Sequence, residues 1–215
     1  GRRILDFGCG LGGYDIDLVR DLGAAHVIGV DIEPHLVAQA RRRVADAGLT
    51  DRIEMRQVGD GLLPFADGAF DIAFSKDAVV HLADKTGTLR ELCRVTAPGG
   101  WLVIGDWFGS DTPMTPEMRA WATEGDETFE MASLNVMAGD LEQLGLTAIQ
   151  AVDRNAWFRD VCREEVERLE GPLFDTYAQR FGAEQARRSV ANARTRLQLA
   201  DQGQLRPGHL RARTP

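Results

Sequence analysis

The sequence predicts an α/β protein in which helices cover both faces of a mostly parallel sheet. Within residues 1–106, short apolar runs alternate five times with longer segments whose apolar residues recur at helical spacing. Strands that alternate with helices in this way form parallel sheets, because each helix carries the chain back to the edge at which the strands start. The first apolar run also ends in a cluster of glycines, which is typical of a tight turn from a buried strand into a helix.

The expected elements of this half follow from these runs and their boundaries. Short apolar runs bounded by turn residues predict strands at residues 4–7, 27–31, 53–58, 71–75 and 101–106. Helical spacing predicts helices at residues 14–22, 34–47 and 84–96, and a Pro-Gly-Gly sequence predicts a turn at residues 98–100. Pro34 suits the first turn of its helix, where a missing N–H costs nothing, and Gly48 ends the same helix.

Helical patterns dominate the second half of the chain. We expect residues 111–145 to be helical and residues 147–152 to form a sixth strand. Residues 156–201 are expected to form helices with two glycine-containing breaks, and residues 205–213 to return as a final strand. No internal repeat or low-complexity linker divides the chain, so one domain with a helical insertion is expected.

Composition and charge exclude several classes of partner. The chain has 215 residues, of which 44% are hydrophobic and 27% charged, the composition of a soluble globular protein. No apolar stretch approaches the ~20 residues that cross a membrane. The net charge of −8 argues against nucleic-acid binding, because neutralisation of phosphates dominates that binding. We therefore expect neither a membrane nor a nucleic acid as partner.

The cysteines and the start of the chain give two further expectations. Cys9, Cys93 and Cys162 are too scattered for a metal site or a disulfide framework. Reduced thiols without a metal are typical of the cytoplasm, so we expect a cytoplasmic protein. The chain starts at Gly1 without an initiator Met and enters an apolar run at once, so we expect a native N-terminal segment to be missing.

The glycine cluster after the first strand fits two kinds of cofactor site. Gly8, Gly10 and Gly13 match the G-x-G-x-x-G pattern of dinucleotide sites. Gly8, Gly10 and Gly12 match the G-x-G-x-G pattern of S-adenosylmethionine sites. Asp31, at the end of the second strand, serves either site, since a carboxylate there can bind both ribose hydroxyls.

Three features favour the sulfonium cofactor. Asp6 precedes the glycines, where a carboxylate is unfavourable beside a pyrophosphate but suits the cationic amino end of methionine. Residues 59–61 follow the third strand, where a side chain can accept a hydrogen bond from the adenine amino group. Residues 97–100 and 205–210 look like the closing elements of a methyltransferase sheet.

On these residues the chain resembles the class I S-adenosylmethionine-dependent methyltransferases. The resemblance implies a Rossmann-like, seven-stranded, mostly parallel sheet whose last strand is antiparallel, with S-adenosylhomocysteine as a product. The cofactor-binding residues it implies are Asp6, Gly8, Gly10, Gly12, Asp31, Ile32, Asp60, Gly61, Ser75 and Lys76. Within a single domain of residues 1–215, it implies a cofactor-binding half at 1–106, a substrate cap with C-terminal helices at 107–203, and a closing strand at 204–213.

The segment after the fourth strand carries the candidate catalytic residues. It leaves the carboxyl end of that strand, beside the crevice in which open α/β sheets bind ligands. Asp77 and His81 are four residues apart, so on a helical turn they share a face. A carboxylate attracts a protonated amine, and a histidine can take its proton and so free the lone pair for attack.

This segment resembles that of the small-amine N-methyltransferases, namely the phosphoethanolamine and the sarcosine/dimethylglycine enzymes. The resemblance implies that Asp77 binds the substrate and His81 is catalytic, with Lys76 in place of an arginine. The tyrosine that partners the histidine in that family lies upstream of the glycine cluster, where this chain does not extend. One departure concerns residues 119–127, where an acidic run replaces the tyrosine and arginine that bind phosphate in the phosphoethanolamine enzymes.

The sequence thus predicts an S-adenosylmethionine-dependent N-methyltransferase that acts on a small polar amine, as a monomer or homodimer. Trp107, Trp121 and Trp157 are candidates for aromatic faces that bind a methylated ammonium. Three alternatives remain: an O- or C-methyltransferase with the same fold, a cofactor-binding subunit without turnover, and a nicotinamide-dependent hydride-transfer enzyme.

Overall fold

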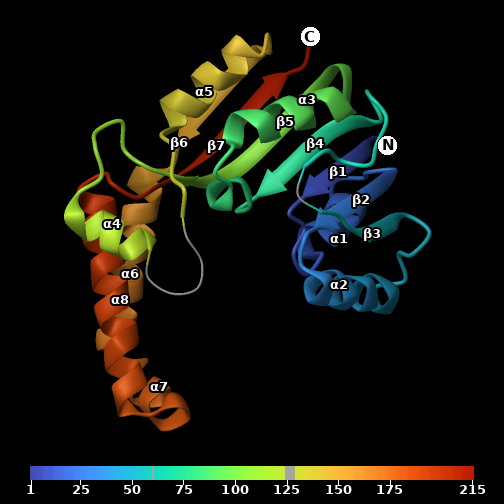
Figure 1. Ribbon diagram of the computed structural model, residues 1–215. Coiled ribbons are helices and arrows are strands. Elements are labelled where there is room, and N and C mark those ends of the chain that lie inside the picture. The colour runs from blue at the N-terminus through green and yellow to red at the C-terminus, as the bar shows by residue number, and fades with distance from the viewer. Residues whose placement is uncertain (60, 124–128) are drawn as a thin grey trace.

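A seven-stranded sheet forms the centre of the protein (Figure 1). The computed structural model describes residues 1–59, 61–123 and 129–215, and the strand order within them is β3-β2-β1-β4-β5-β7-β6. The strands are β1 (Arg3–Phe7), β2 (His26–Asp31), β3 (Ile53–Gln57), β4 (Phe70–Lys76), β5 (Thr96–Phe108), β6 (Thr147–Asp153) and β7 (Arg206–Arg213). β7 is antiparallel to both of its neighbours, and the other pairs are parallel. The expected architecture, including the antiparallel last strand, is confirmed.

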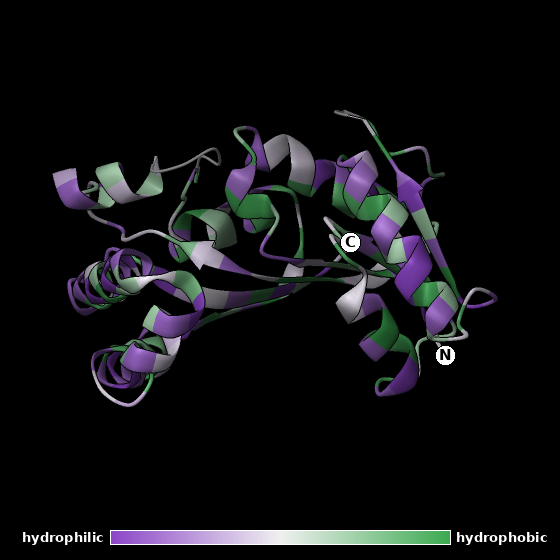
Figure 2. Ribbon diagram, turned by 90° about the horizontal axis from the view of Figure 1, so that it is seen from below, coloured by the Kyte–Doolittle hydropathy of each residue, from purple (hydrophilic) through white to green (hydrophobic). Residues whose placement is uncertain are grey.

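Helices lie on both sides of this sheet, and each helix contains both hydrophobic and hydrophilic residues (Figure 2). They are α1 (Gly13–Arg20), α2 (Pro34–Asp46), the short 3₁₀ helix η1 (Val79–His81), α3 (Lys85–Val95), α4 (Pro116–Ala122), α5 (Leu134–Gln143), α6 (Asn155–Glu170), α7 (Phe174–Phe181) and α8 (Ala183–Asp201). Every helix in the described part of the chain is too short or too polar to span a bilayer.

Two sequence-based expectations are wrong. The expected turn at 98–100 is a bulge inside β5: Phe70 pairs with Thr96, whereas Ile72 pairs with Trp101, so β5 carries extra residues there. Residues 111–145 are not continuously helical either. Where this stretch is described, it contains the separate helices α4 and α5, whose N-caps are Thr115 and Ser133.

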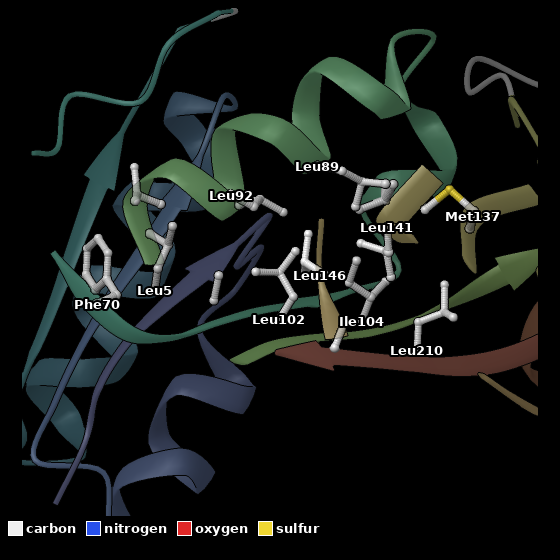
Figure 3. Packing of buried hydrophobic residues seen from close by; sticks show 14 of the residues in the cluster. Leu5, Phe70, Leu89, Leu92, Leu102, Ile104, Met137, Leu141, Leu146 and Leu210 are labelled. Atoms are coloured by element: carbon white, nitrogen blue, oxygen red, sulfur yellow. The ribbon is translucent and has the colours of Figure 1, made fainter. Parts of the chain in front are cut away.

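Two apolar clusters hold the sheet between its helices. On one face, Leu5 and Leu102 from the strands pack with Leu89 and Leu141 from α3 and α5 (Figure 3). On the other face, Val27 belongs to a cluster to which α1 and α2 contribute. Buried apolar side chains of this size each contribute about 1.5–3 kcal/mol, so these clusters fix the strand ends that carry the site.

Helices α6, α7 and α8 extend from one end of the sheet as an arm (Figure 1). A third apolar cluster joins the base of this arm to α4 and includes Met118, Phe158 and Leu199. Ion pairs at 2.6 Å, Arg159 with Asp201 and Arg196 with Glu165, link α6 to α8. These contacts hold the helices of the arm together, and the start of α6 lies beside the end of β5 and the start of β7.

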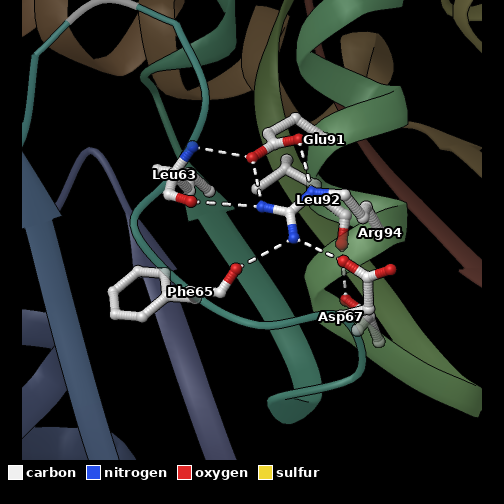
Figure 4. Close-up of polar contacts among 7 residues, drawn as sticks. Leu63, Phe65, Asp67, Glu91, Leu92 and Arg94 are labelled. Carbon is white, nitrogen blue, oxygen red and sulfur yellow. Dashed lines mark hydrogen bonds and ion pairs between the residues drawn. The ribbon is translucent and has the colours of Figure 1, made fainter.

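A cluster of polar contacts fixes the loop that follows residue 61 (Figure 4). The Arg94 guanidinium donates to the carboxylates of Glu91 and Asp67, each at 2.6 Å, and to the backbone oxygens of Phe65 and Leu63. Glu91 in turn accepts a hydrogen bond from the backbone N–H of Leu63 at 2.6 Å. This network anchors the loop between β3 and β4 to α3.

Candidate active site

A cavity of about 470 Å³ opens at the carboxyl ends of β1 and β2. The turn after β1, the end of β2 and the segment after β4 contribute its lining. Its lining includes Gly8, Gly10, Asp31, Ile32, Asp77 and His81. Open α/β sheets bind ligands in the crevice at this edge.

A neighbouring cavity of about 430 Å³ shares part of this lining. Ile32, Val58 and Leu82 border both cavities, and Gly61 and Leu62 border the second. Asp60, which the sequence placed at the edge of the adenine, lies outside the described residues. Gly61 adopts φ +111° at the wall of the second cavity, and its contact with a cofactor stays a prediction.

Each glycine of the turn after β1 occupies a different environment. Gly8 adopts φ +77°, and a Cβ on it would collide with the Cβ of Ala78, so the turn and the segment after β4 lie in direct contact. Gly12 adopts φ +72°, and its missing side chain lets Met55 and Ala40 pack directly against the turn. Gly10 adopts φ +51°, and a Cβ on it would meet no other atom within 4 Å, so its free side faces open space.

Asp31 connects the end of β2 to the glycine turn. One carboxylate oxygen accepts a hydrogen bond from the backbone N–H of Gly10, and the other accepts from that of Glu33, both at 2.9 Å. The next residue, Ile32, is 52% exposed although it is large and apolar. A carboxylate and an exposed apolar face thus stand side by side at the cavity.

Asp6 and Asp15 form a buried carboxyl pair beneath the turn. Asp6 is 2% exposed and Asp15 is fully buried. Burial raises the pKa of both carboxyl groups, that of Asp15 to about 6, and the neighbouring Asp15 raises the pKa of Asp6 further. Two carboxylates this close repel each other when both are ionised, so the raised pKa values indicate that the pair keeps a proton to a higher pH than two separate carboxyl groups would.

Asp77 and His81 line the same cavity, although they do not share a helical turn. Asp77 directly follows β4 and adopts φ +55°, and its backbone N–H donates to the oxygen of Gly105 at 2.9 Å. The helical turn that follows is the three-residue 3₁₀ helix η1, which begins at Val79 and ends at His81. The expected common helix face is therefore wrong, although both residues line one cavity.

An aromatic stack contacts His81 on one side. The ring of Phe129 lies 5.2 Å from that of His81, and Trp121 stacks on Phe129 at 5.3 Å with an interplanar angle of 14°. The backbone N–H of Glu130 donates to the oxygen of Val80 at 2.8 Å, which attaches this segment to η1. Trp121 therefore supports the histidine through Phe129 instead of lining the cavity.

Asp106 is a site residue that the sequence did not single out. It is 4% exposed, and its two carboxylate oxygens accept hydrogen bonds from the backbone N–H groups of Val80 and Trp107, at 3.0 and 2.8 Å. Burial raises the pKa of Asp106 to about 6, although these two hydrogen bonds lower it. An acidic residue at the end of the fifth expected strand was the one signal that could have found it.

Three of the expected cofactor-binding residues do not line this cavity. Ser75 is fully buried and its hydroxyl donates to the backbone oxygen of Phe7 at 2.9 Å, so it joins β4 to β1 instead of facing a ligand. Lys76 pairs with Asp77 and lines a different cavity. Asp6 is enclosed beneath the glycine turn, so of the expected acids Asp31 is the one on the described cavity wall.

Comparison with known proteins identifies the family. The family described as the methyltransferase domain matches residues 1–167. The chain belongs to this family. The cofactor of the domain is S-adenosylmethionine, in agreement with the pattern of Gly8, Gly10 and Gly12.

Two curated relatives illustrate the range of this methyltransferase domain. Phosphoethanolamine N-methyltransferase 1 of Arabidopsis thaliana is 28% identical over 170 residues, which are 79% of this chain and 34% of that protein. The 27-O-demethylrifamycin SV methyltransferase of Amycolatopsis mediterranei is 29% identical over 173 residues, 80% of this chain and 63% of that protein. The chain thus spans about a third of the plant relative.

Solved structures share the fold at low identity. Phosphoethanolamine N-methyltransferase 2 of Haemonchus contortus, in complex with phosphomonomethylethanolamine and S-adenosylhomocysteine, matches with a TM-score of 0.86 and 22% identity, covering 100% of this chain and 49% of that one. A structure described as a sarcosine dimethylglycine methyltransferase from Galdieria sulphuraria matches with a TM-score of 0.84 and 22% identity, covering 99% and 78%.

Proposed function

We propose that this methyltransferase transfers a methyl group from S-adenosylmethionine to the nitrogen of a small polar amine. The observation that carries the proposal is that Asp77 and His81 line the same cavity as Gly8, Gly10 and Asp31. The cofactor-binding turn and a carboxylate–imidazole pair therefore face one space.

The residues of the cavity fit the cofactor. The open side of Gly10 leaves the backbone accessible to the methionine end, and Ile32 offers an apolar face to the adenine. Asp31 has acceptor capacity beyond its two backbone partners, because each carboxylate oxygen has a second lone pair for a ribose hydroxyl. When bound, the cofactor supplies an electrophilic methyl group on a sulfonium.

Asp77 and His81 supply what an amine acceptor needs. The Asp77 carboxylate, whose side chain is 44% exposed, attracts the substrate ammonium and orients it. A protonated amine has no lone pair to attack with, so a base must remove its proton. We assign this task to His81, which η1 and Phe129 hold at the cavity.

The substrate differs from that of the phosphoethanolamine enzymes in our proposal. The acidic residues Glu124, Asp126 and Glu127 replace phosphate-binding groups in the sequence, and they lie outside the described residues, so this support comes from the sequence alone. Repulsion between carboxylates and a phosphate dianion disfavours a phosphorylated amine. Trp107 is the aromatic face that we assign to the substrate.

Methylation of oxygen is the second candidate, since the Amycolatopsis relative is named for a 27-O-demethylrifamycin substrate. A general base at His81 serves a hydroxyl as well as an amine. We also propose that the enzyme is cytoplasmic and acts as a monomer or homodimer. Residues 1–106 would bind the cofactor, and residues 107–203 would cap the substrate.

Product analysis tests this proposal. The protein is incubated with methyl-labelled S-adenosylmethionine and a panel of amines, alcohols and phenols, and the labelled products are identified by mass spectrometry and NMR. We expect label on nitrogen, and His81→Ala should reduce the rate about 10²-fold or more. His26→Ala, at the start of β2, is the matched control. Label on oxygen alone, or an unchanged rate for His81→Ala, would contradict the proposal.

A further inference from the structure

A separate cavity of about 320 Å³ lies between the end of β5, the start of β7 and the start of α6. Asp77 lines both this cavity and the cofactor cavity. Lys76 lines it as well, and pairs with Asp77. The two cavities thus meet at the carboxylate to which we assigned the substrate ammonium.

Most of the wall that α6 and β5 contribute is aromatic or aliphatic. Trp107 and Phe158 pack edge to face with their ring centroids 5.0 Å apart. Trp157 and Val161, also on this wall, are 52% and 37% exposed. Apolar surface in contact with water is unfavourable by ~25 cal/mol per Å², so these side chains favour an apolar occupant, and flat aromatic walls favour a flat one.

The charged residues of the cavity determine how a charged ligand is oriented in it. Asp106 contributes negative potential, but it is 4% exposed and its two oxygens already accept backbone hydrogen bonds, so it offers a ligand little surface. Asp77 is the more exposed carboxylate, and a substrate ammonium has to compete with Lys76 for it. The Arg154 guanidinium also lines the cavity and lies 4.9 Å from the centre of the Trp157 ring, so this second charge is a cation that repels a ligand ammonium. The cation of a ligand therefore belongs at the Asp77 end.

We infer that this cavity binds the body of the methyl acceptor, and that the acceptor is an amine attached to a flat ring through a short chain. The inference rests on the proposed N-methyl transfer and adds the substrate class to it. The ring lies among Trp107, Trp157 and Val161, and the amine reaches Asp77 at the junction with the cofactor cavity.

Two amines that share an aminoethyl group test the inference. 2-Phenylethylamine carries a ring and ethanolamine carries a hydroxyl in the same position. Release of S-adenosylhomocysteine gives kcat/KM for each. We expect 2-phenylethylamine to be preferred about 10-fold or more, the size of effect that a matched apolar pocket produces.

A pair of exposed valines provides the variants. Val161→Trp should fill part of the cavity and reduce the preference about 10-fold. Val136→Trp, on α5 at 57% exposure, should leave it unchanged. Thermal unfolding verifies that both variants fold, since both side chains are at the surface.

The outcomes separate the two proposals. A preference for ethanolamine, or an unchanged preference in Val161→Trp, would overturn the inference about the ring and leave N-methyl transfer standing. Binding of S-adenosylhomocysteine without methylation of either amine, or of any amine in the panel, would overturn both.

Discussion

Asp106 accepts a hydrogen bond from the backbone N–H of Val80 at 3.0 Å, across 26 residues of sequence. This bond joins the end of β5 to η1, the short helix that carries His81. The other Asp106 oxygen accepts from the N–H of Trp107. One buried carboxylate thus sets the position of both the candidate base and an aromatic wall of the substrate cavity.

Replacement of Asp106 by Asn should separate catalysis from cofactor binding. The amide NH₂ would face a backbone donor, so one hydrogen bond is lost and His81 shifts. We expect turnover to fall about 10-fold and stability to fall by about 1–3 kcal/mol, while the affinity for S-adenosylhomocysteine is retained. Calorimetry, kinetics and urea unfolding measure the three quantities, with the exposed Asp46→Asn as control. Unchanged turnover would remove Asp106 from the mechanism.

Gly8→Ala should destabilise the protein through a specific contact. The left-handed backbone alone costs an alanine about 1–2 kcal/mol, and the new Cβ collides with Ala78. Adding Ala78→Gly removes the collision and should restore part of the lost stability. A double-mutant cycle by urea unfolding measures this coupling. Additive effects of the two substitutions would show that the turn and the segment after β4 are not in contact.

The Asp6–Asp15 pair predicts a decrease in stability as the pH rises. The pKa of Asp15 is raised to about 6 in the folded protein, so between about pH 4 and 6 the folded state holds more protons than the unfolded state. The slope of the unfolding free energy against pH is therefore negative in this window, and the loss persists at higher pH.

Asp15→Asn tests this pH dependence. Asparagine is nearly isosteric and donates to Asp6 without titrating. We expect the variant to gain on the order of 2 kcal/mol over the wild type at pH 7.5 and to differ little at pH 4. Asp17→Asn, exposed on the same helix, is the matched control. Parallel pH profiles for Asp15→Asn and the wild type would contradict the raised pKa of Asp15.

The sequence predicted the strands and the glycine turn because local patterns determine them. Buried parallel strands are short apolar runs, and the helices between them show helical spacing. The convergence of Asp77 with Gly8 and Asp31 was also predictable, since the carboxyl ends of parallel strands meet at one edge of the sheet. The bulge in β5 was not, because Pro-Gly-Gly equally suits a turn.

The roles of Asp15, Asp106 and Ser75 could not be predicted from local sequence. Asp15 is buried because α1 packs over Gly29. A Cβ on Gly29 would lie only 2.6 Å from the Oδ1 atom of Asp15. Asp106 finds its partner Val80 through the pairing of β5 with β4. Ser75 follows the alternation of β4 into the core, where its hydroxyl donates a hydrogen bond to the backbone oxygen of Phe7. Each role depends on a contact between segments distant in the sequence.

The affinity of Asp31→Ala for S-adenosylhomocysteine tests the central claim most directly. Asp31 both binds the Gly10 N–H and stands at the cavity that we assign to the cofactor. Calorimetry should show at least about a 10-fold weaker affinity, equivalent to about 1.4 kcal/mol, with Asp46→Ala unchanged and both variants folded. An affinity of Asp31→Ala equal to that of the wild type would contradict the placement of the cofactor in this cavity.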